Sequence, residues 1–216
     1  IRGLYMKSPS DFYLATDGGV FRSTDTANTW ENISGKGLTA MQIYGIEQLS
    51  KDTFLVGCQD MGYFMLQNKK WVQLGSYYGD GGDAIRTPQG TYILMVGTAR
   101  RIALSNPTKY TYLHPDRFTP FIAKFEQHPY TLDSFYYIGQ SCWFFDGKSF
   151  RNLTKSIPKT ADMVLGFDVN QTAHNQLFIS YNQPTWSGDN LKSKLFKSTD
   201  GGESWEDITA SLGILS

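Results

Sequence analysis

The sequence has no excess of either charge, little cysteine and no long apolar run. Twenty Lys and Arg residues balance twenty Asp and Glu residues, so no net field attracts nucleic acid or anionic lipid. No apolar segment approaches the roughly 20 residues of a membrane-spanning helix. The two cysteines, Cys58 and Cys142, match no metal-ligand or CxxC spacing. We therefore expect no nucleic acid, membrane span, metal or cofactor, and two small buried thiols, with a disulfide as the open alternative.

Charged residues are also scarce, at 19%, whereas aromatic residues make up 15% of the 216 residues and glycine contributes 21. This profile favours many short strands and tight turns, and no stretch has the period of an amphipathic helix. The composition therefore indicates an all-β protein. The chain shows no signal peptide and begins with Ile1 rather than Met, so we expect a mature, trimmed or excised product.

One eight-residue segment occurs twice. Ser-Thr-Asp-Thr-Ala-Asn-Thr-Trp at 23–30 recurs as Ser-Thr-Asp-Gly-Gly-Glu-Ser-Trp at 198–205, and both copies continue to an Ile three residues after the Trp. A similar ending, an aromatic residue followed three positions later by Leu, is found at Trp71 and Phe150. A weaker copy, in which Leu follows directly, is found at Tyr112. These aromatic residues are 38 to 55 positions apart. A four-stranded propeller blade takes roughly 40 to 50 residues, so the spacing predicts a series of blades.

Each repeat divides into four short strands, A to D, separated by Gly, Asp, Asn and Pro. In the third repeat, for example, strands are predicted at 83–87, 91–97, 101–105 and 110–113. We expect a β-propeller of four-stranded antiparallel blades, about five in this chain, forming one domain over 1–216. Because both ends of the series look cut, the chain could also be part of a larger propeller. The predicted blades are at about 1–34, 39–75, 80–113, 119–154 and 160–209.

The repeated segment has a physical role in the turn between strands C and D. The carboxylate of Asp25 or Asp200 can accept several N–H groups that the reversing chain exposes. Gly202 provides a position with positive φ, and the closing Trp can pack between neighbouring blades. The first copy has Ala27 in place of the glycine, so we expect a slightly different turn there, with Asn28 in the left-handed conformation.

These residues resemble a known family. Ser-x-Asp-x-Gly-x-Thr-Trp is the Asp-box of the BNR-repeat propellers, which include sialidases, sortilin-like domains and xyloglucanase-type glycoside hydrolases. The segment at 16–25 closely resembles the blade consensus of large secreted bacterial BNR proteins. The resemblance covers essentially the whole chain and implies a secreted or cell-surface location. It also implies a structural role, away from the ligand face, for the Asp-box residues Ser23, Asp25, Trp30, Ser198, Asp200, Gly202 and Trp205.

In a propeller, the D-to-A connections and the B-to-C turns lie at the same end of the blades, and ligands usually bind there. The predicted strand boundaries place six segments at this end, residues 58–61, 76–82, 98–100, 114–119, 139–141 and 182–193. The last of these segments is the longest, and long loops in a fold of short loops tend to be functional.

Carboxylates and aromatic residues are the candidates for chemistry at this end. Glycosidic hydrolysis usually needs two carboxylates, for which Asp60 and Asp80 are weak candidates, because Asp-Gly pairs are also simple turn formers. Sugar rings stack on Trp and Tyr beside polar side chains, and Trp186 fits this chemistry best. Arg86 does not match the arginine motif of a sialidase. The predicted ligand-binding residues are Gln59, Asp60, Tyr77, Tyr78, Asp80, Arg100, Arg101, Trp143 and Trp186.

The blade-building sequence is intact, but no catalytic set can be recognised. The leading hypothesis is therefore a non-catalytic binding module for a glycan or a protein ligand. Two alternatives stay open. One is part of a glycoside hydrolase of the Asp-box type, and the other is a purely structural segment of a large surface or adhesion protein.

Overall fold

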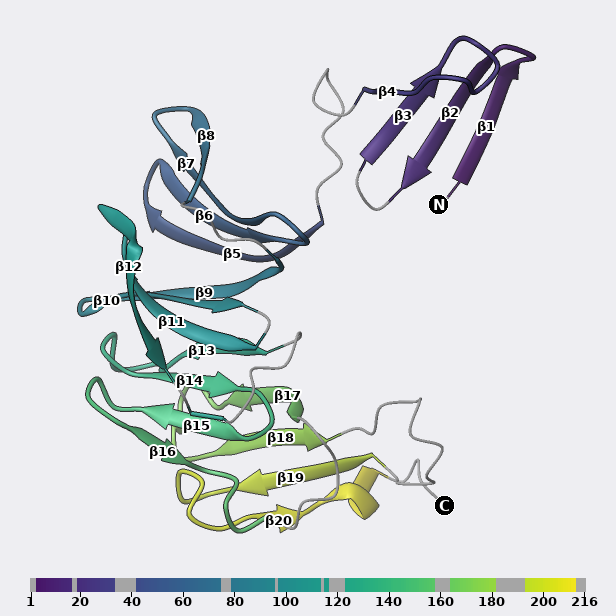
Figure 1. Cartoon of the computed structure of the whole chain (residues 1–216). Coiled ribbons are helices and arrows are strands. Elements are labelled where there is room, and N and C mark those ends of the chain that lie inside the picture. Colours follow the sequence, from purple (N-terminus) through teal and green to yellow (C-terminus); the bar gives the residue numbers. More distant parts are fainter. Residues whose placement is uncertain are drawn as a thin grey trace. The chain divides into compact units, whose positions relative to one another are not determined.

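The computed structural model describes residues 3–16, 19–33, 42–74, 79–95, 97–113, 115–116, 123–157, 164–181 and 193–212. The contacts divide the chain into two compact units, residues 1–43 and 44–216. The first unit contains one β-sheet and the second contains four (Figure 1). In the described residues the regular helical structure is a single 3-10 turn, η1 (Thr209–Leu212).

Each sheet has four strands that follow one another in chain order, and neighbouring strands pair antiparallel. The structure confirms an all-β β-propeller fold with five four-stranded blades. Blade 1 is β1 (Gly3–Ser8), β2 (Asp11–Thr16), β3 (Gly19–Ser23) and β4 (Glu31–Asn32); blade 2 is β5 (Ile43–Ser50), β6 (Thr53–Cys58), β7 (Gly62–Gln67) and β8 (Lys70–Gln73); blade 3 is β9 (Gly81–Thr87), β10 (Gly90–Met95), β11 (Thr98–Ala103) and β12 (Asn106–Leu113); blade 4 is β13 (Lys124–Gln127), β14 (Phe135–Ile138), β15 (Cys142–Phe145) and β16 (Phe150–Asn152); blade 5 is β17 (Val164–Val169), β18 (Leu177–Tyr181), β19 (Lys194–Ser198) and β20 (Glu206–Asp207).

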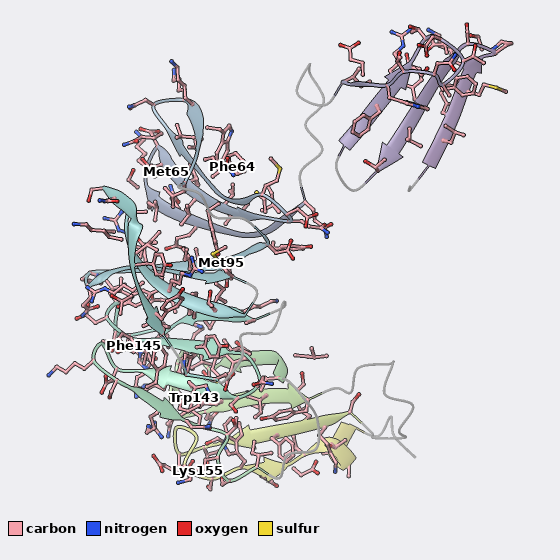
Figure 2. The ribbon with its side chains drawn as sticks, in the orientation of Figure 1. Phe64, Met65, Met95, Trp143, Phe145 and Lys155 are labelled. Carbon is pink, nitrogen blue, oxygen red and sulfur yellow. The ribbon has the colours of Figure 1, made fainter. Side chains whose placement is uncertain are left out.

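Three apolar clusters fill the spaces between neighbouring sheets of the second unit. Blades 2 and 3 share a cluster that includes Tyr63 and Met95, and Met95 is labelled in Figure 2. Blades 3 and 4 share a second, with Tyr92 against Phe135 at 4.9 Å between ring centroids. A third, with Leu153 and Leu177, joins blades 4 and 5. Burial of apolar surface between sheets is the main force that holds such an array together.

Blade 1 has a different burial pattern. Among its described side chains Ser23 alone is buried, and the apolar residues of β1, Leu4, Tyr5 and Met6, are exposed. The sheet is held instead by its ladder hydrogen bonds and by an ion pair in which Arg22 donates to both carboxylate oxygens of Asp11, at 2.9 and 2.8 Å. Bidentate arginine–carboxylate pairs are among the stronger charged hydrogen bonds.

Blade 3 differs from the sequence prediction in one place that affects the site. Strand C was expected at 101–105, after a loop at 98–100, but β11 begins at Thr98 and pairs with β10 from there. The chain reverses immediately before it, where Gly97 has a φ of 80°. A turn this short moves Arg100 from the expected loop, and Arg101 from the expected start of the strand, into the body of β11.

Both cysteines are buried, and neither forms a disulfide bond. Cys58 ends β6 and Cys142 begins β15, so they belong to blades 2 and 4. Burial raises the pKa of both thiols and holds them in the neutral form. Of the two sequence alternatives, the structure therefore has the two small buried side chains.

Candidate ligand-binding face

The two copies of the eight-residue segment form the same hydrogen-bonded turn. In blade 5 the Oδ1 atom of Asp200 accepts from the Ser198 hydroxyl at 2.8 Å and from the backbone N–H of Ser204 at 2.9 Å. Its Oδ2 atom accepts from the Ser204 hydroxyl. The Ser198 hydroxyl oxygen in turn accepts from the backbone N–H of Gly202 at 2.9 Å. Side-chain oxygens thus replace the ladder bonds that the turn interrupts.

In blade 1, Asp25 accepts from the Ser23 hydroxyl at 2.8 Å, from the Thr29 backbone N–H at 2.9 Å and from the Thr29 hydroxyl at 2.6 Å. The hydrogen bonds lower the pKa of Asp25 and of Asp200 to about 2. The hydroxyl of Thr29 has the largest effect on the pKa of Asp25, and the hydroxyl of Ser204 has the largest effect on that of Asp200. A carboxylate that accepts several hydrogen bonds is stabilised in its charged form.

The expectation for Ala27 was wrong. The left-handed positions of the first turn are Thr26, at φ 62°, and Ala27 itself, at φ 66°, whereas the second turn has Gly201 at 72° and Gly202 at 88°. The first copy therefore keeps the same backbone and accepts the steric cost of two side chains at positive φ, because the carboxylate network holds the turn.

The closing aromatic residues have different surroundings in the different blades. The indole N–H of Trp205 donates to the carbonyl oxygen of Leu153 in blade 4 at 2.7 Å, and its ring packs on the cluster between blades 4 and 5. Phe150 packs on the cluster between blades 3 and 4. Trp30 is 36% exposed and Trp71 is 54% exposed. The packing expected between blades is therefore present at Trp205 and Phe150.

The B-to-C turns and the D-to-A connections lie at one end of the blades of the second unit, which we call the loop face. Its described residues are 59–61, 79–80, 97, 115–116 and 139–141. Among the sequence candidates, Gln59, Asp60 and Asp80 lie there, and Trp143 lies close to it, as the second residue of β15. Tyr77, Tyr78 and Trp186 lie outside the described residues, so their sites remain sequence predictions.

Between blades 2 and 3 the loop face is built from backbone. The N–H of Gly62 donates to the carbonyl of Gly79 at 2.8 Å, and Met61 and Gly79 form a parallel bridge. A Cβ on Gly81 would lie 2.2 Å from the Gly62 carbonyl oxygen, so only glycine allows this approach. The carboxylate of Asp80 completes the contact, because its Oδ1 accepts from the N–H of Asp60 at 2.7 Å. Asp60 itself has a φ of 58°.

Between blades 3 and 4 a second carboxylate, that of Asp116, likewise accepts a backbone N–H of a turn in the next blade. It lies in the D-to-A connection, and its Oδ2 accepts from the backbone N–H of Ser141 at 3.1 Å. Its Oδ1 accepts from the indole N–H of Trp143 at 2.8 Å. Burial raises the pKa of Asp116, and the hydrogen bonds from Trp143 and the turn oppose that rise. The Trp143 ring is therefore fixed in orientation while it packs on the cluster between blades 3 and 4 and stays partly exposed.

Asp116 is absent from the sequence candidates, although the segment 114–119 was placed at this end. The available signal was its position: like Asp80, it is an acid in a D-to-A connection, next to a turn whose backbone N–H groups need acceptors.

A hollow of about 430 Å³ lies on the A strands, β9 and β13, and is lined in part by Asp83, Lys124 and Glu126. Asp83 accepts from the N–H of Phe125 in the next blade at 2.9 Å and from its neighbour Ala84 at 2.9 Å. Burial raises the pKa of Asp83. Burial and the nearby charges of Asp168 and Asp83 raise the pKa of Glu126. Asp83 thus joins two A strands.

Arg100 and Arg101 are consecutive in β11 and make different contacts. The Arg100 guanidinium lies over the Tyr110 ring at 4.4 Å and the Tyr112 ring at 5.3 Å. Arg101 donates to the carbonyl of Gln89 in the turn between β9 and β10. Because alternate strand residues point to opposite faces of a sheet, the strand separates these two cations.

In the described part of the chain no group of three or more His, Cys, Asp or Glu residues is arranged to hold a metal ion. The same part of the chain has no helix that is both long and apolar enough to cross a membrane.

The comparisons with known proteins concern the fold. No family model matches the chain, and no curated protein matches it. Among solved structures, an ancestral GH74 enzyme has a TM-score of 0.61 at 10% identity, over 97% of this chain and 31% of that one. The extracellular domain of a putative one-component system from B. thetaiotaomicron has a TM-score of 0.58 at 10% identity, over 95% and 27%. The tricorn protease has 0.51 at 8% identity, over 92% and 20%. The chain thus spans less than a third of each of these larger proteins, and it shares their β-propeller fold.

Proposed function

We propose that this chain is a non-catalytic binding module, a β-propeller of the Asp-box type that takes a glycan or a protein ligand on its loop face. The observation that carries the proposal is the arrangement around Asp116. A partly buried carboxylate holds the Trp143 indole through its N–H at 2.8 Å and holds the adjoining turn through Ser141. A fixed aromatic ring beside polar groups is what carbohydrate and protein sites share.

The use of the loop-face carboxylates supports binding over hydrolysis. Glycosidic cleavage needs an acid and a second carboxylate that are about 5 to 10 Å apart and free to act on the substrate. Asp80 instead accepts the Asp60 N–H, and Asp116 accepts from Trp143 and Ser141. Each of these acids maintains the backbone of a turn, so protonating or removing it would disturb the face itself.

The Asp-box assignment draws its support from the two matching carboxylate turns at Asp25 and Asp200. We also propose a secreted or cell-surface location, in keeping with that family resemblance, and one structural neighbour is an extracellular domain. Because GH74 enzymes are also neighbours, a glycoside hydrolase is the competing function for the test.

The test combines a panel of soluble polysaccharides and surface-protein extracts with calorimetry and a reducing-sugar assay. We expect saturable binding of at least one ligand without product release. For a glycan ligand, Trp143→Phe and Trp186→Ala should each weaken binding, by about 1–3 kcal/mol for a buried contact aromatic. Trp71→Phe is the control, because Trp71 is an exposed residue of β8 near the C-to-D turn, away from the loop face.

Turnover that disappears in Asp60→Asn or Asp80→Asn would replace the proposal with the hydrolase. Binding that is unchanged in both loop-face tryptophan variants would remove the loop face as the site. The absence of binding to every probe would favour a structural segment.

A further inference from the structure

A second hollow lies on blade 3, at the opposite end of the strands from the loop face. Its volume is about 510 Å³. It is formed around the turn between β9 and β10, with walls from β11 and β12. The strand β10 runs from Gly90 at this hollow to Met95 near the B-to-C turn. Six strand residues extend roughly 20 Å, so the hollow is separate from the site proposed above.

The charges of this hollow all have one sign. Arg86 of β9, Arg101 of β11 and Lys109 of β12 line it, and no Asp or Glu does. None of the ion pairs between described residues involves these three cations. The remaining lining includes the exposed Thr111 and the partly exposed ring of Tyr110, whereas Thr87 and Thr91 are buried. With a net charge of zero for the whole chain, this concentration of positive charge is local.

Two of the cations are held in place by backbone. Arg101 donates through Nη2 to the Gln89 carbonyl, and Arg86 donates through Nη1 to the Leu49 carbonyl in blade 2. Gly90 lies under Arg101, where a Cβ would meet its Nε at 2.8 Å. Each guanidinium has five N–H donors, so one bond to a carbonyl fixes the side chain and leaves several donors for a ligand. Such pre-positioning lowers the entropy cost of binding.

One carboxylate lies nearby without lining the hollow. Glu47 of β5 accepts the backbone N–H of Arg86 at 2.9 Å and belongs to an adjoining hollow of about 370 Å³. Burial is the main effect that raises the pKa of Glu47. The Glu47 Oε1 atom accepts from the main chain of Arg86, so this carboxylate does not form an ion pair with the Arg86 guanidinium.

We propose that this hollow is a binding site for an acidic saccharide, whose carboxylate or sulfate groups pair with Arg101, Lys109 and Arg86. Guanidinium groups match planar oxyanions through paired N–H donors. The exposed Thr111 hydroxyl binds a neighbouring sugar hydroxyl, and the Tyr110 ring supports one face of a sugar ring. The volume is in the range of sites that hold small ligands. The proposal is independent of the loop-face function.

Calorimetry of the full chain at low salt tests the site. The probes are tetragalacturonate, its fully methyl-esterified form, a heparin tetrasaccharide and inorganic phosphate. We expect binding of at least one acidic tetrasaccharide, with tetragalacturonate and the heparin fragment distinguishing carboxylate from sulfate recognition. The neutral ester should bind at least tenfold more weakly than tetragalacturonate if carboxylate is the recognised group.

The double variant Arg101→Gln/Lys109→Gln should lose at least tenfold in affinity for the acidic probe and keep its thermal midpoint. Because Arg101 also contacts the turn at Gln89, the single variant Lys109→Gln, at an exposed side chain, provides a second reading with an expected severalfold loss. Arg151→Gln is the matched control, since Arg151 is an exposed arginine of blade 4 that pairs with Glu203 at 2.6 Å. It should leave the affinity unchanged.

Three results would overturn the site. One is that the folded double variant binds each acidic tetrasaccharide as tightly as the unaltered chain does. A second is equal binding of the neutral ester and tetragalacturonate, together with no binding of heparin. The third is binding of inorganic phosphate as tight as that of the saccharides, because it would indicate an unselective anion patch.

Discussion

The turn at residues 23–30 and the turn at residues 198–205 have the same hydrogen bonds, yet their tryptophans differ. In both, one Asp accepts from the Ser two residues before it and from the residue four positions after it. Trp205 then donates to Leu153 of the neighbouring blade, whereas Trp30 is 36% exposed. The carboxylate network is therefore a local property of eight residues, and at Trp205 the ring adds a contact with the neighbouring blade.

The largest contrast is expected from removing the rings. Trp205→Ala should lower the free energy of unfolding by about 3 kcal/mol, at the lower end for a buried aromatic, because the ring is only partly buried. Trp30→Ala should cost roughly 1 kcal/mol or less, since its ring is already exposed. Urea denaturation of the two variants measures both values. Trp205→Phe should give an intermediate loss, because it keeps the packing and leaves the Leu153 carbonyl without its donor. Equal losses at 30 and 205 would contradict the comparison.

The next effect concerns the glycine that faces the neighbouring blade. Gly202 has a φ of 88°, and a Cβ there would lie 3.0 Å from the Leu153 Cβ. Gly202→Ala should therefore destabilise blade 5 by about 2 kcal/mol, from the left-handed backbone and the crowding together. Gly201→Ala is the control, because it has a φ of 72° and open space around the added atom, so only the backbone cost remains. A thermal melt that ranks Gly201→Ala as the worse variant would argue against the contact with Leu153.

Removing either carboxylate should loosen its own turn and little else. Asp200→Ala should lower stability and speed amide exchange at Gly202 and Ser204, and Asp25→Ala should do so at Ala27 and Thr29. Hydrogen exchange followed by mass spectrometry locates these changes. Ligand affinity at the loop face should be unaffected in both variants. A fall in affinity without a change in exchange would assign the carboxylate to ligand binding instead.

Acid should affect the two turns together. The pKa of each Asp is lowered from 3.8 to about 2, so the folded state favours the charged form. Its contribution to stability is complete above the unfolded pKa, near 4, and is lost as the pH falls toward 2. Unfolding curves between pH 6 and pH 2 should show a drop that is smaller in Asp25→Asn/Asp200→Asn than in the unaltered chain. Parallel curves would indicate that other carboxylates set the acid limit.

The smallest effect is expected at the position where the two turns differ. Ala27→Gly should stabilise blade 1 by about 0.5–1 kcal/mol, because relief at a φ of 66° exceeds the entropy that glycine adds to the unfolded chain. Slower amide exchange at Thr29 would report it. A destabilised turn would mean that Ala27 is not strained.

The strand pattern was predictable because it depends on local signals. In blade 3 the strands predicted at 83–87 and 91–97 correspond to β9 and β10 to within two residues at each end. The signals failed at the third strand of this blade, where the turn before Thr98 is too short to leave a run of turn residues.

The site was harder to predict, because its contacts join different blades. Asp80 and Asp116 make equivalent bonds to turn amides, but their partners are 20 residues before and 25 residues after them in the chain. Sequence placed their segments at one end of the blades, and it could not pair Asp116 with Trp143. The cations on blade 3 illustrate the same limit, since Arg86 and Arg101 share one hollow only through the register of three strands.

The chain-order pairing within every sheet also bears on how the protein is made. Because each blade uses one contiguous segment of about 40 residues, its hydrogen bonds can form as soon as that segment leaves the ribosome. No blade waits for a strand from a distant part of the chain, and the loop-closure entropy is small. Within the second unit, synthesis therefore adds blades one after another, and each new blade completes the apolar cluster on the blade before it.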